Sequence, residues 1–132
     1  MNGKSIAILS EAERHRLVQS PLDGEGLKLM FEAGLIWLTT NQQYVNSLNV
    51  FPVPDGDTGT NMVLTMQAAF AEAETKSTNN VGEMANAFAQ GALMGARGNS
   101  GVILSQIWRG FSRALDHYER MDSALFVRAL QE

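Results

Sequence analysis

Apolar residues recur at helical spacing along most of the chain. Their i, i+3, i+4 and i+7 pattern predicts long helices, with one short helical turn near residues 44–48. The predicted long helices cover residues 24–40, 59–75, 80–94, 100–119 and 124–132. No alternation of apolar and polar positions lasts more than about four residues, so no strand is predicted. The fold class is therefore all-α, an antiparallel up-and-down helical bundle or barrel.

Polar residues mark the starts of several predicted helices. Asp23 is the expected N-cap of the first one, and Asn80 with Glu83 resembles a capping box. Residues 121–123 are expected to cap the last helix. Each helix of a closed barrel buries one apolar stripe. The stripes expected to face the core include Leu27, Met30, Leu35 and Leu38 in the first helix, and Ile103, Ile107 and Phe111 in the helix at 100–119.

The helical pattern is interrupted at residues 49–62, which read NVFPVPDGDTGTNM. Pro52 and Pro54 lack amide donors and favour extended backbone, so no helix crosses them. Side chains two positions apart in an extended chain point the same way, so Asp55 and Asp57 can converge on one cation. A helix is predicted to begin directly after them, and helix N-terminal amides can bind an anion.

Two other interpretations of this stretch compete with a cation site. An aspartate at this position can act simply as an N-cap. An EF-hand is disfavoured, because counting from Asp55 puts the glycine at the fifth place and Met66 at the twelfth, where a glutamate is required. Magnesium takes one or two carboxylates and leaves its other positions to phosphates and water. The aspartate pair, with the free amides expected at Gly59 and Thr60, thus predicts a magnesium–phosphate site.

A second unusual loop lies at residues 95–101, which read GARGNSG. A glycine-rich turn at a helix start can present bare amides to a phosphate chain. The alternative is a helix–helix turn, with Gly98 ending one helix and Asn99 or Ser100 capping the next. Because alternate connections of an up-and-down bundle lie at the same end, this loop and the aspartate loop are predicted to meet at one mouth.

Composition and charge exclude several classes of protein. The hydrophobic fraction is 45% and the charged fraction 18%, which is typical of a globular domain. Ten basic and 14 acidic residues give a net charge of −4, and no basic stripe is present, so nucleic-acid binding is disfavoured. No apolar run is long enough for a membrane span, and no secretory signal is recognisable. A cytoplasmic location is therefore expected.

The two loops together resemble the signatures of a kinase family. Residues 49–62 resemble the metal–nucleotide loop of the dihydroxyacetone kinase L-domain family, also called DhaL or DAK2. Residues 94–106 resemble the second signature of one branch, the N-terminal domain of the A subunit of bacterial fatty acid kinase. The resemblance runs from about Leu22 to the last residue, and two long motifs in the same order make it specific.

The resemblance implies a barrel of antiparallel helices that binds ATP or ADP and two Mg²⁺ ions at one end. By motif match, Asp55 and Asp57 would be metal ligands. Other branches use a third, upstream aspartate, and Asn49 is the nearest polar residue here, although the spacing differs by one. The residues that would contact the nucleotide are Thr58, Gly59, Thr60, Asn61, Gly98, Asn99, Ser100 and Gly101.

The family's activity is transfer of the ATP γ-phosphate to an acceptor carried by a partner. In the most similar branch the acceptor is a fatty acid carboxylate on a DegV-like fatty-acid-binding protein, and the product is an acyl phosphate. The alternatives are dihydroxyacetone (glycerone) kinase chemistry, a non-catalytic nucleotide-binding regulatory module, and a helical interaction domain.

The resemblance also suggests how the chain is organised. Residues 1–21 form an N-terminal extension, and residues 22–132 form the front part of a DhaL-like nucleotide-binding domain. The family domain continues further, so the chain is expected to be incomplete at its C-terminus. Alone it is expected to bind ATP poorly, and to be loosely packed or self-associating, with a homodimer among the possible states.

Overall fold

The computed structural model describes residues 10–11, 21–50 and 54–132. Within these ranges the helices are α2 (Gly24–Thr40), α3 (Gln42–Ser47), α4 (Thr58–Glu74), α5 (Val81–Gly95), α6 (Gly98–Ala114) and α7 (Ser123–Gln131). The described part contains no strand, so the all-α prediction is confirmed. The predicted bounds of α2, α4, α5 and α7 agree to within one residue. None of these helices is long and apolar enough to cross a membrane.

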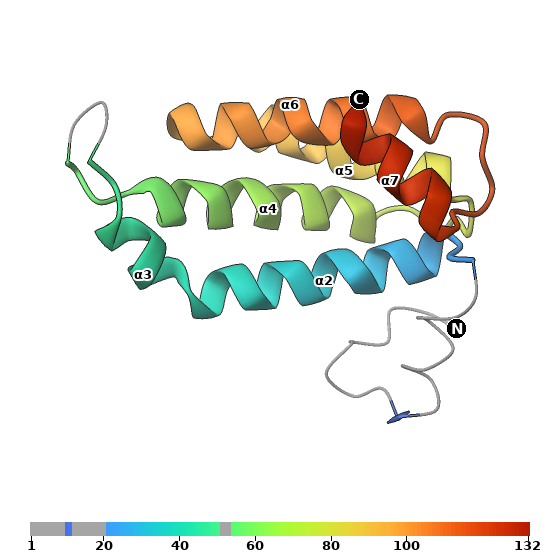
Figure 1. Cartoon of the computed structure of the whole chain (residues 1–132), viewed down its shortest axis with the longest axis horizontal. Coiled ribbons are helices and arrows are strands. Elements are labelled where there is room, and N and C mark those ends of the chain that lie inside the picture. Colours follow the sequence, from blue (N-terminus) through green and yellow to red (C-terminus); the bar gives the residue numbers. More distant parts are fainter. Residues whose placement is uncertain (1–9, 12–20, 51–53) are drawn as a thin grey trace.

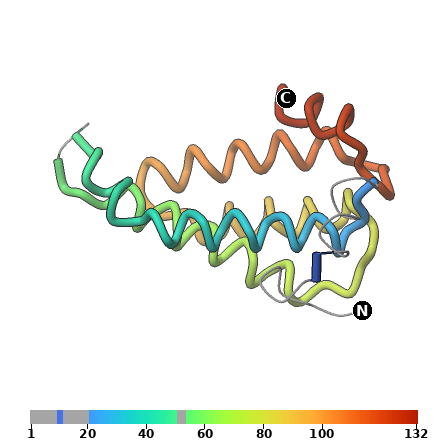
Figure 2. The backbone as a smooth tube through the Cα atoms, turned by 60° about the horizontal axis from the view of Figure 1, so that its bottom comes forward, coloured from blue at the N-terminus to red at the C-terminus, as the bar shows by residue number. Residues whose placement is uncertain are grey.

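Four long helices form the body of the bundle (Figure 1). Helices α4 and α5 lie at its centre, and each packs against both α2 and α6. The short α3 packs on α4, and α7 folds back over one end of α6 (Figure 2). The expected antiparallel arrangement is therefore present, with α2 and α6 on the two sides of a central helix pair.

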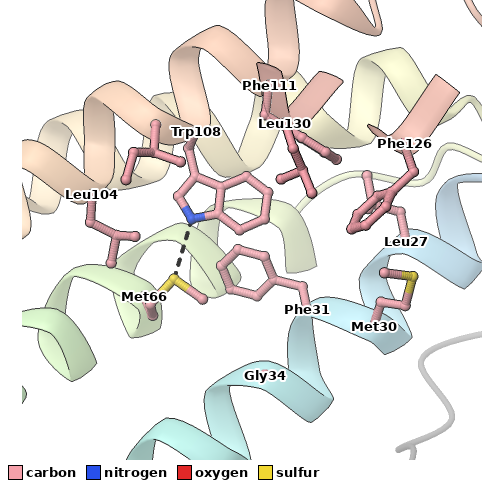
Figure 3. Close-up of a pocket in the computed structure, with 11 residues that line it drawn as sticks. Leu27, Met30, Phe31, Gly34, Met66, Leu104, Trp108, Phe111, Phe126 and Leu130 are labelled. Atoms are coloured by element: carbon pink, nitrogen blue, oxygen red, sulfur yellow. Dashed lines mark hydrogen bonds between the residues drawn. The ribbon is translucent and has the colours of Figure 1, made fainter. Parts of the chain in front are cut away.

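An aromatic cluster fills the centre of the bundle. The rings of Phe31 and Phe88 stack with centroids 3.9 Å apart, and Trp108 lies 4.8 Å from Phe31. The indole Nε1 of Trp108 donates to the sulfur of Met66 at 3.3 Å (Figure 3). Phe88 is fully buried, and burial of such a side chain contributes about 2–3 kcal/mol. The central helix α5 thus links the cores formed with α2 and α6.

The predicted caps are found at three helix starts. The carboxylate of Asp23 accepts from the Gly26 amide at 2.9 Å. Asn80 accepts from the Glu83 amide at 3.0 Å, but the Glu83 carboxylate accepts from the Thr78 hydroxyl instead of completing the capping box. The third cap is Asp122, which accepts from the Leu125 amide at 2.8 Å.

Backbone hydrogen bonds tie several connections together at the end of the bundle opposite α3 (Figure 1). Leu22 and Met121 exchange two bonds of 2.8 Å in an isolated antiparallel bridge. The segment between α6 and α7 accepts from the first amides of α5. Val81 donates to Glu119 at 2.9 Å, and Gly82 donates to Tyr118 at 3.1 Å. Separately, the Gly24 amide at the start of α2 donates to Asn79, in the segment between α4 and α5, at 2.6 Å.

Helix α6 ends at Ala114, five residues earlier than predicted. The sequence after it carries no glycine or proline to mark this end. The chain instead leaves the helix because the following carbonyls bind α5, and His117 adopts a left-handed φ of 70° in the turn. The predicted length was wrong because a long-range contact, which periodicity does not detect, ends this helix.

The buried face of α6 also differs in part from the predicted stripe. Phe111 is buried as expected, whereas Ile103 and Ile107 are 61% and 56% exposed. The face that packs on α4 and α5 carries Gly101, Ser105 and Ser112 instead. Small side chains on this face allow the helices to approach closely. The buried Ser105 hydroxyl still has a hydrogen-bond partner, because it donates to the carbonyl of Val102 at 2.7 Å.

An apolar groove of about 250 Å³ lies between α2, α6 and α7 (Figure 3). Leu27 is buried beneath it, whereas Met30 and Leu130 are exposed in its wall. Leu35 and Leu38 are half-buried against the core. The stripes on α2 and α6, which were predicted to face the core, are therefore only partly covered within the described residues.

Candidate functional site

The two unusual loops meet at one end of the bundle. The first turns of α4 and α6 lie together at the end that carries α3 (Figure 1). The hydroxyl of Ser100 donates to the carbonyl of Thr58 at 3.2 Å, which joins residues 42 positions apart. The prediction that the loops share one mouth is therefore confirmed. Two helix N-termini converge there, and each is a favourable place for an anion.

Gly98 begins helix α6 and does not end α5. Its φ is +63°, a conformation that residues with a Cβ rarely adopt. A Cβ at this position would also lie 2.3 Å from Nδ2 of Asn61 on α4. The N-cap of α6 is Arg97, so the alternative in which Asn99 or Ser100 caps this helix is wrong. Glycine is needed here because the helix starts against α4.

The first turn of α6 leaves its amides available. The first backbone hydrogen bond at its start runs from the Gly101 amide to the Arg97 carbonyl at 3.0 Å. The amides of Gly98, Asn99 and Ser100 have no partner among the described residues. The Arg97 amide donates to the hydroxyl of Thr65 at 3.1 Å, which anchors this turn on α4. Three adjacent amides at a helix start can bind a phosphate group.

The aspartate pair lies just before α4. Asp55 is exposed, and Asp57 is half-buried at the N-cap position without making a side-chain cap bond. Gly56 between them has a φ of +67°, which bends the backbone. Asn49 Oδ1 accepts from the Asp57 amide at 3.1 Å and so braces the loop. The three predicted metal-site residues are therefore brought together.

The carboxyl group of Asp55 is affected by its surroundings and by Asp57. The pKa of Asp55 is raised from 3.8 by loss of hydration in the loop, and then by a hydrogen bond to Asp57 and by its negative charge. A bound cation would relieve this repulsion. No group of three or more Asp, Glu, His or Cys side chains suited to a metal occurs in the described part of the chain. A metal here would thus take two carboxylates, with water or phosphate completing its shell, which fits Mg²⁺.

Side chains of helix α3 form hydrogen bonds with the first turn of α4. This contact was not predicted from the sequence. Asn46 Oδ1 accepts from the Thr60 amide at 3.0 Å, and Asn46 Nδ2 donates to the Thr60 hydroxyl at 3.1 Å. Gln42 Nε2 donates to the same hydroxyl at 3.0 Å. The expectation of a free Thr60 amide is therefore wrong, whereas the Thr58 and Gly59 amides have no partner among the described residues.

The sequence carries a signal for this contact. Gln42 and Asn46 are four residues apart, so they share one face of a short helix directly before the aspartate loop. Asn61 and Thr65 on α4 have the same spacing, and they are the residues that meet Gly98 and Gly101. Two polar i, i+4 pairs thus position the two loops.

A family comparison agrees with this geometry. The model of the DAK2 domain family matches residues 52–132, more than half of the chain, so the chain belongs to the DAK2 domain family. The matched region begins in the aspartate loop and contains the whole glycine-rich loop. A DAK2 domain is a nucleotide-binding module of the kinase type.

Similar proteins occur in bacteria. Protein YloV of Bacillus subtilis is 49% identical over 110 residues, which cover 83% of this chain and 20% of YloV. Uncharacterized proteins of Staphylococcus saprophyticus and Staphylococcus aureus are 46% identical over 112 residues, 85% of this chain and 20% of theirs. The chain therefore spans about a fifth of the length of the curated relatives it matches.

Proposed function

We propose that the mouth formed by α4 and α6 binds Mg-ATP, and that the γ-phosphate is transferred to an acceptor presented by a partner protein. The observation that carries this proposal is the hydrogen bond from Ser100 to Thr58, because it joins the start of α6, whose first amides have no partner among the described residues, to the residue that follows Asp57. Each feature alone occurs at ordinary turns. Their convergence in a DAK2 domain supports a metal–nucleotide site.

In this proposal, Asp55 and Asp57 ligate Mg²⁺, and two ions are bound when the nucleotide is present. Asn49 is a candidate third ligand because its side chain lies against the aspartate loop, where Asn49 Oδ1 accepts from the Asp57 amide. Magnesium bound with a nucleotide neutralises phosphate charge. The roles assigned to this chain are to hold the metal with the carboxylates and to orient the phosphates.

The phosphates are assigned to the helix starts. The amides of Gly98, Asn99 and Ser100 contact one phosphate group, and the amides of Thr58 and Gly59 contact another. Asn61 and Gly101 keep the two turns in register, since both lie in the α4–α6 contact. Arg97 is exposed next to Gly98 and adds positive charge at the mouth. No side-chain base is required, because positioning and charge neutralisation supply most of the catalysis in phosphoryl transfer.

The proposed acceptor is a fatty acid carboxylate carried by a DegV-like protein. Attack of a carboxylate oxygen on the γ-phosphorus forms the new O–P bond, breaks the bond to the β-phosphate oxygen, and yields an acyl phosphate and ADP. Dihydroxyacetone phosphorylation is the second candidate acceptor chemistry, and a non-catalytic nucleotide-binding regulator is the alternative outside enzymology.

Calorimetric titration with Mg-ADP tests nucleotide binding, with YloV as a longer relative alongside the chain. Heat of binding from either protein that disappears on removal of Mg²⁺ supports the site. Absence of binding in both proteins at millimolar Mg-ADP favours a helical interaction domain. Transfer of radioactive γ-phosphate from ATP to a fatty acid, assayed with a DegV-like protein, then separates a kinase from a regulator, and dihydroxyacetone in place of the fatty acid tests the second acceptor.

A further inference from the structure

Asn46 performs the capping of α4 that its N-cap residue would ordinarily perform. An N-cap side chain commonly accepts from the amide two or three residues later. Asp57 occupies the N-cap position but makes no such bond. Asn46 Oδ1, on α3, accepts from the Thr60 amide at 3.0 Å instead. The Asp57 carboxylate therefore accepts no capping hydrogen bond from α4.

The same helix fixes the hydrogen-bonding role of the Thr60 hydroxyl. A hydroxyl offers one donor and two acceptor lone pairs. Gln42 Nε2 and Asn46 Nδ2 donate to this oxygen at 3.0 and 3.1 Å, so both acceptor positions are occupied. The Thr60 hydroxyl can then form a further hydrogen bond only as a donor, through its O–H group. A donor suits a phosphate oxygen, whereas a metal ion would require a lone pair.

The contact between α3 and α4 is close enough to hold these groups in place. A Cβ on Gly59 would lie 2.5 Å from the Gln42 carbonyl and 2.9 Å from Asn46 Oδ1. Glycine at this position therefore lets α3 lie directly on the first turn of α4. The amide pair approaches Thr60 from a second helix and is not carried by the loop itself.

We propose that Gln42 and Asn46 are positioning residues of the mouth. Asn46 replaces Asp57 as the cap of α4 and so leaves the Asp57 carboxylate free for Mg²⁺. Both residues hold the Thr60 hydroxyl as a donor toward a nucleotide phosphate oxygen. This inference rests on the proposed function, and it assigns the anion to Thr60 and the cation to Asp57.

The two roles predict different responses to ligand. Loss of Gln42 frees one lone pair of Thr60 but leaves the cap intact, so nucleotide affinity falls while the magnesium requirement is unchanged. Loss of Asn46 exposes the Thr60 amide, and Asp57 can then turn back to cap it. Asn46→Ala should therefore weaken nucleotide binding and also raise the magnesium concentration needed for it. If Gln42 and Asn46 only stabilise the fold, their replacement should lower the melting temperature and change neither nucleotide affinity nor the magnesium requirement.

The experiment measures ADP affinity and its magnesium midpoint in the 132-residue chain by ligand-induced shifts in melting temperature. The variants are Gln42→Ala, Asn46→Ala, Thr60→Val and Thr60→Ser. Ser47→Ala is the matched control, because Ser47 lies on α3 but donates to the Tyr44 carbonyl. The double variant Gln42→Ala/Thr60→Val measures coupling.

Thr60→Val is expected to weaken ADP binding about tenfold, as for one hydrogen bond to a charged group, whereas Thr60→Ser stays within about threefold. Gln42→Ala should cause roughly a threefold loss that disappears in the Thr60→Val background. Asn46→Ala alone should raise the magnesium midpoint severalfold. Unchanged affinity and midpoint in Gln42→Ala and Asn46→Ala, in a wild-type background that binds Mg-ADP, would overturn the inference.

The proposed function fails separately from this inference, when the wild-type chain and YloV both show no magnesium-dependent ADP binding. Amide exchange without ligand gives a further check on Asn46 itself. Because Asp57 can replace the lost cap, the comparison is made in an Asp57→Ala background. If Thr60 exchanges no faster in Asn46→Ala/Asp57→Ala than in Ser47→Ala/Asp57→Ala, Asn46 does not cap α4 and the inference is overturned.

Discussion

Gly98 and Asn61 are packed so closely that a methyl group on Gly98 would lie 2.3 Å from the Asn61 amide nitrogen. This contact seats the start of α6 on the first turn of α4, and the positive φ of Gly98 directs the following amides into the mouth. Two independent constraints, backbone conformation and space, therefore require glycine at the same position.

Replacement of Gly98 should damage both folding and ligand binding. A left-handed conformation costs a residue with a Cβ about 1–2 kcal/mol, and the Asn61 side chain must also move. Gly98→Val is expected to lower the melting temperature and to weaken nucleotide binding beyond what unfolding explains. Gly34→Ala is the control, because its added methyl meets no atom within 4 Å and helix propensity should raise stability by about 0.5–1 kcal/mol. Unchanged affinity per folded molecule in Gly98→Val would make the loop a structural turn only.

Asp55 and Asp57 should stabilise the chain when Mg-ADP is bound, and not when it is free of ligand. Because loss of hydration, and then the hydrogen bond and negative charge of Asp57, raise the pKa of Asp55, its charged form is disfavoured in the folded chain. Asp55→Asn is therefore expected to raise the melting temperature slightly at neutral pH in the absence of metal. The same change should abolish most of the added stability from Mg-ADP. Asp57→Asn should preserve the fold and lose most magnesium-dependent nucleotide affinity. Thermal melts with EDTA and with Mg-ADP measure both effects, and intact magnesium dependence in Asp57→Asn would remove the metal assignment.

Lys28 should contribute more to stability than the other ion-paired lysine of the described chain. Its side chain is largely buried, its Nζ lies 3.1 Å from a Glu74 oxygen, and it lies over the Phe70 ring at 5.9 Å. Lys28→Ala is therefore expected to lower the free energy of unfolding by about 1–2 kcal/mol. Lys76→Ala removes an exposed pair at 3.8 Å and should change it by less than about 0.5 kcal/mol. Urea titrations compare the two variants, and equal losses would contradict this ranking.

The exposed apolar side chains around the groove predict concentration-dependent association. Contiguous apolar surface of this kind usually marks an interface or an aggregation hazard. Sedimentation of the 132-residue chain should show association that Ile107→Gln reduces. Val127→Gln is the control, because Val127 is equally exposed but does not line the groove. A sharp monomer with cooperative melting and full nucleotide affinity would show that these stripes need no further cover.

The extents of most helices followed from the sequence because periodicity and capping residues agree there. Asp23, Asn80 and Asp122 each accept a hydrogen bond at a predicted start. The buried face of α6 did not follow, since Gly101 and Ser105 are buried for their small size and not for hydrophobicity. The meeting of the two loops followed from topology. The contacts of Thr60 with α3 did not, because they depend on how closely two helices approach.

The backbone bonds between Leu22 and Met121 give the bundle unequal ends. At that end the connections are joined by main-chain groups, whereas at the mouth the hydrogen bonds between α3, α4 and α6 within the described residues involve side chains. Opening of the mouth therefore breaks fewer main-chain bonds than separation of the opposite end. Native-state hydrogen exchange should rise in steps along α4 toward Thr58, with Leu22 and Met121 exchanging together in one event. For the proposed nucleotide, entry at the mouth would then need only local opening of one end of the bundle, while the backbone bonds at the other end stay intact.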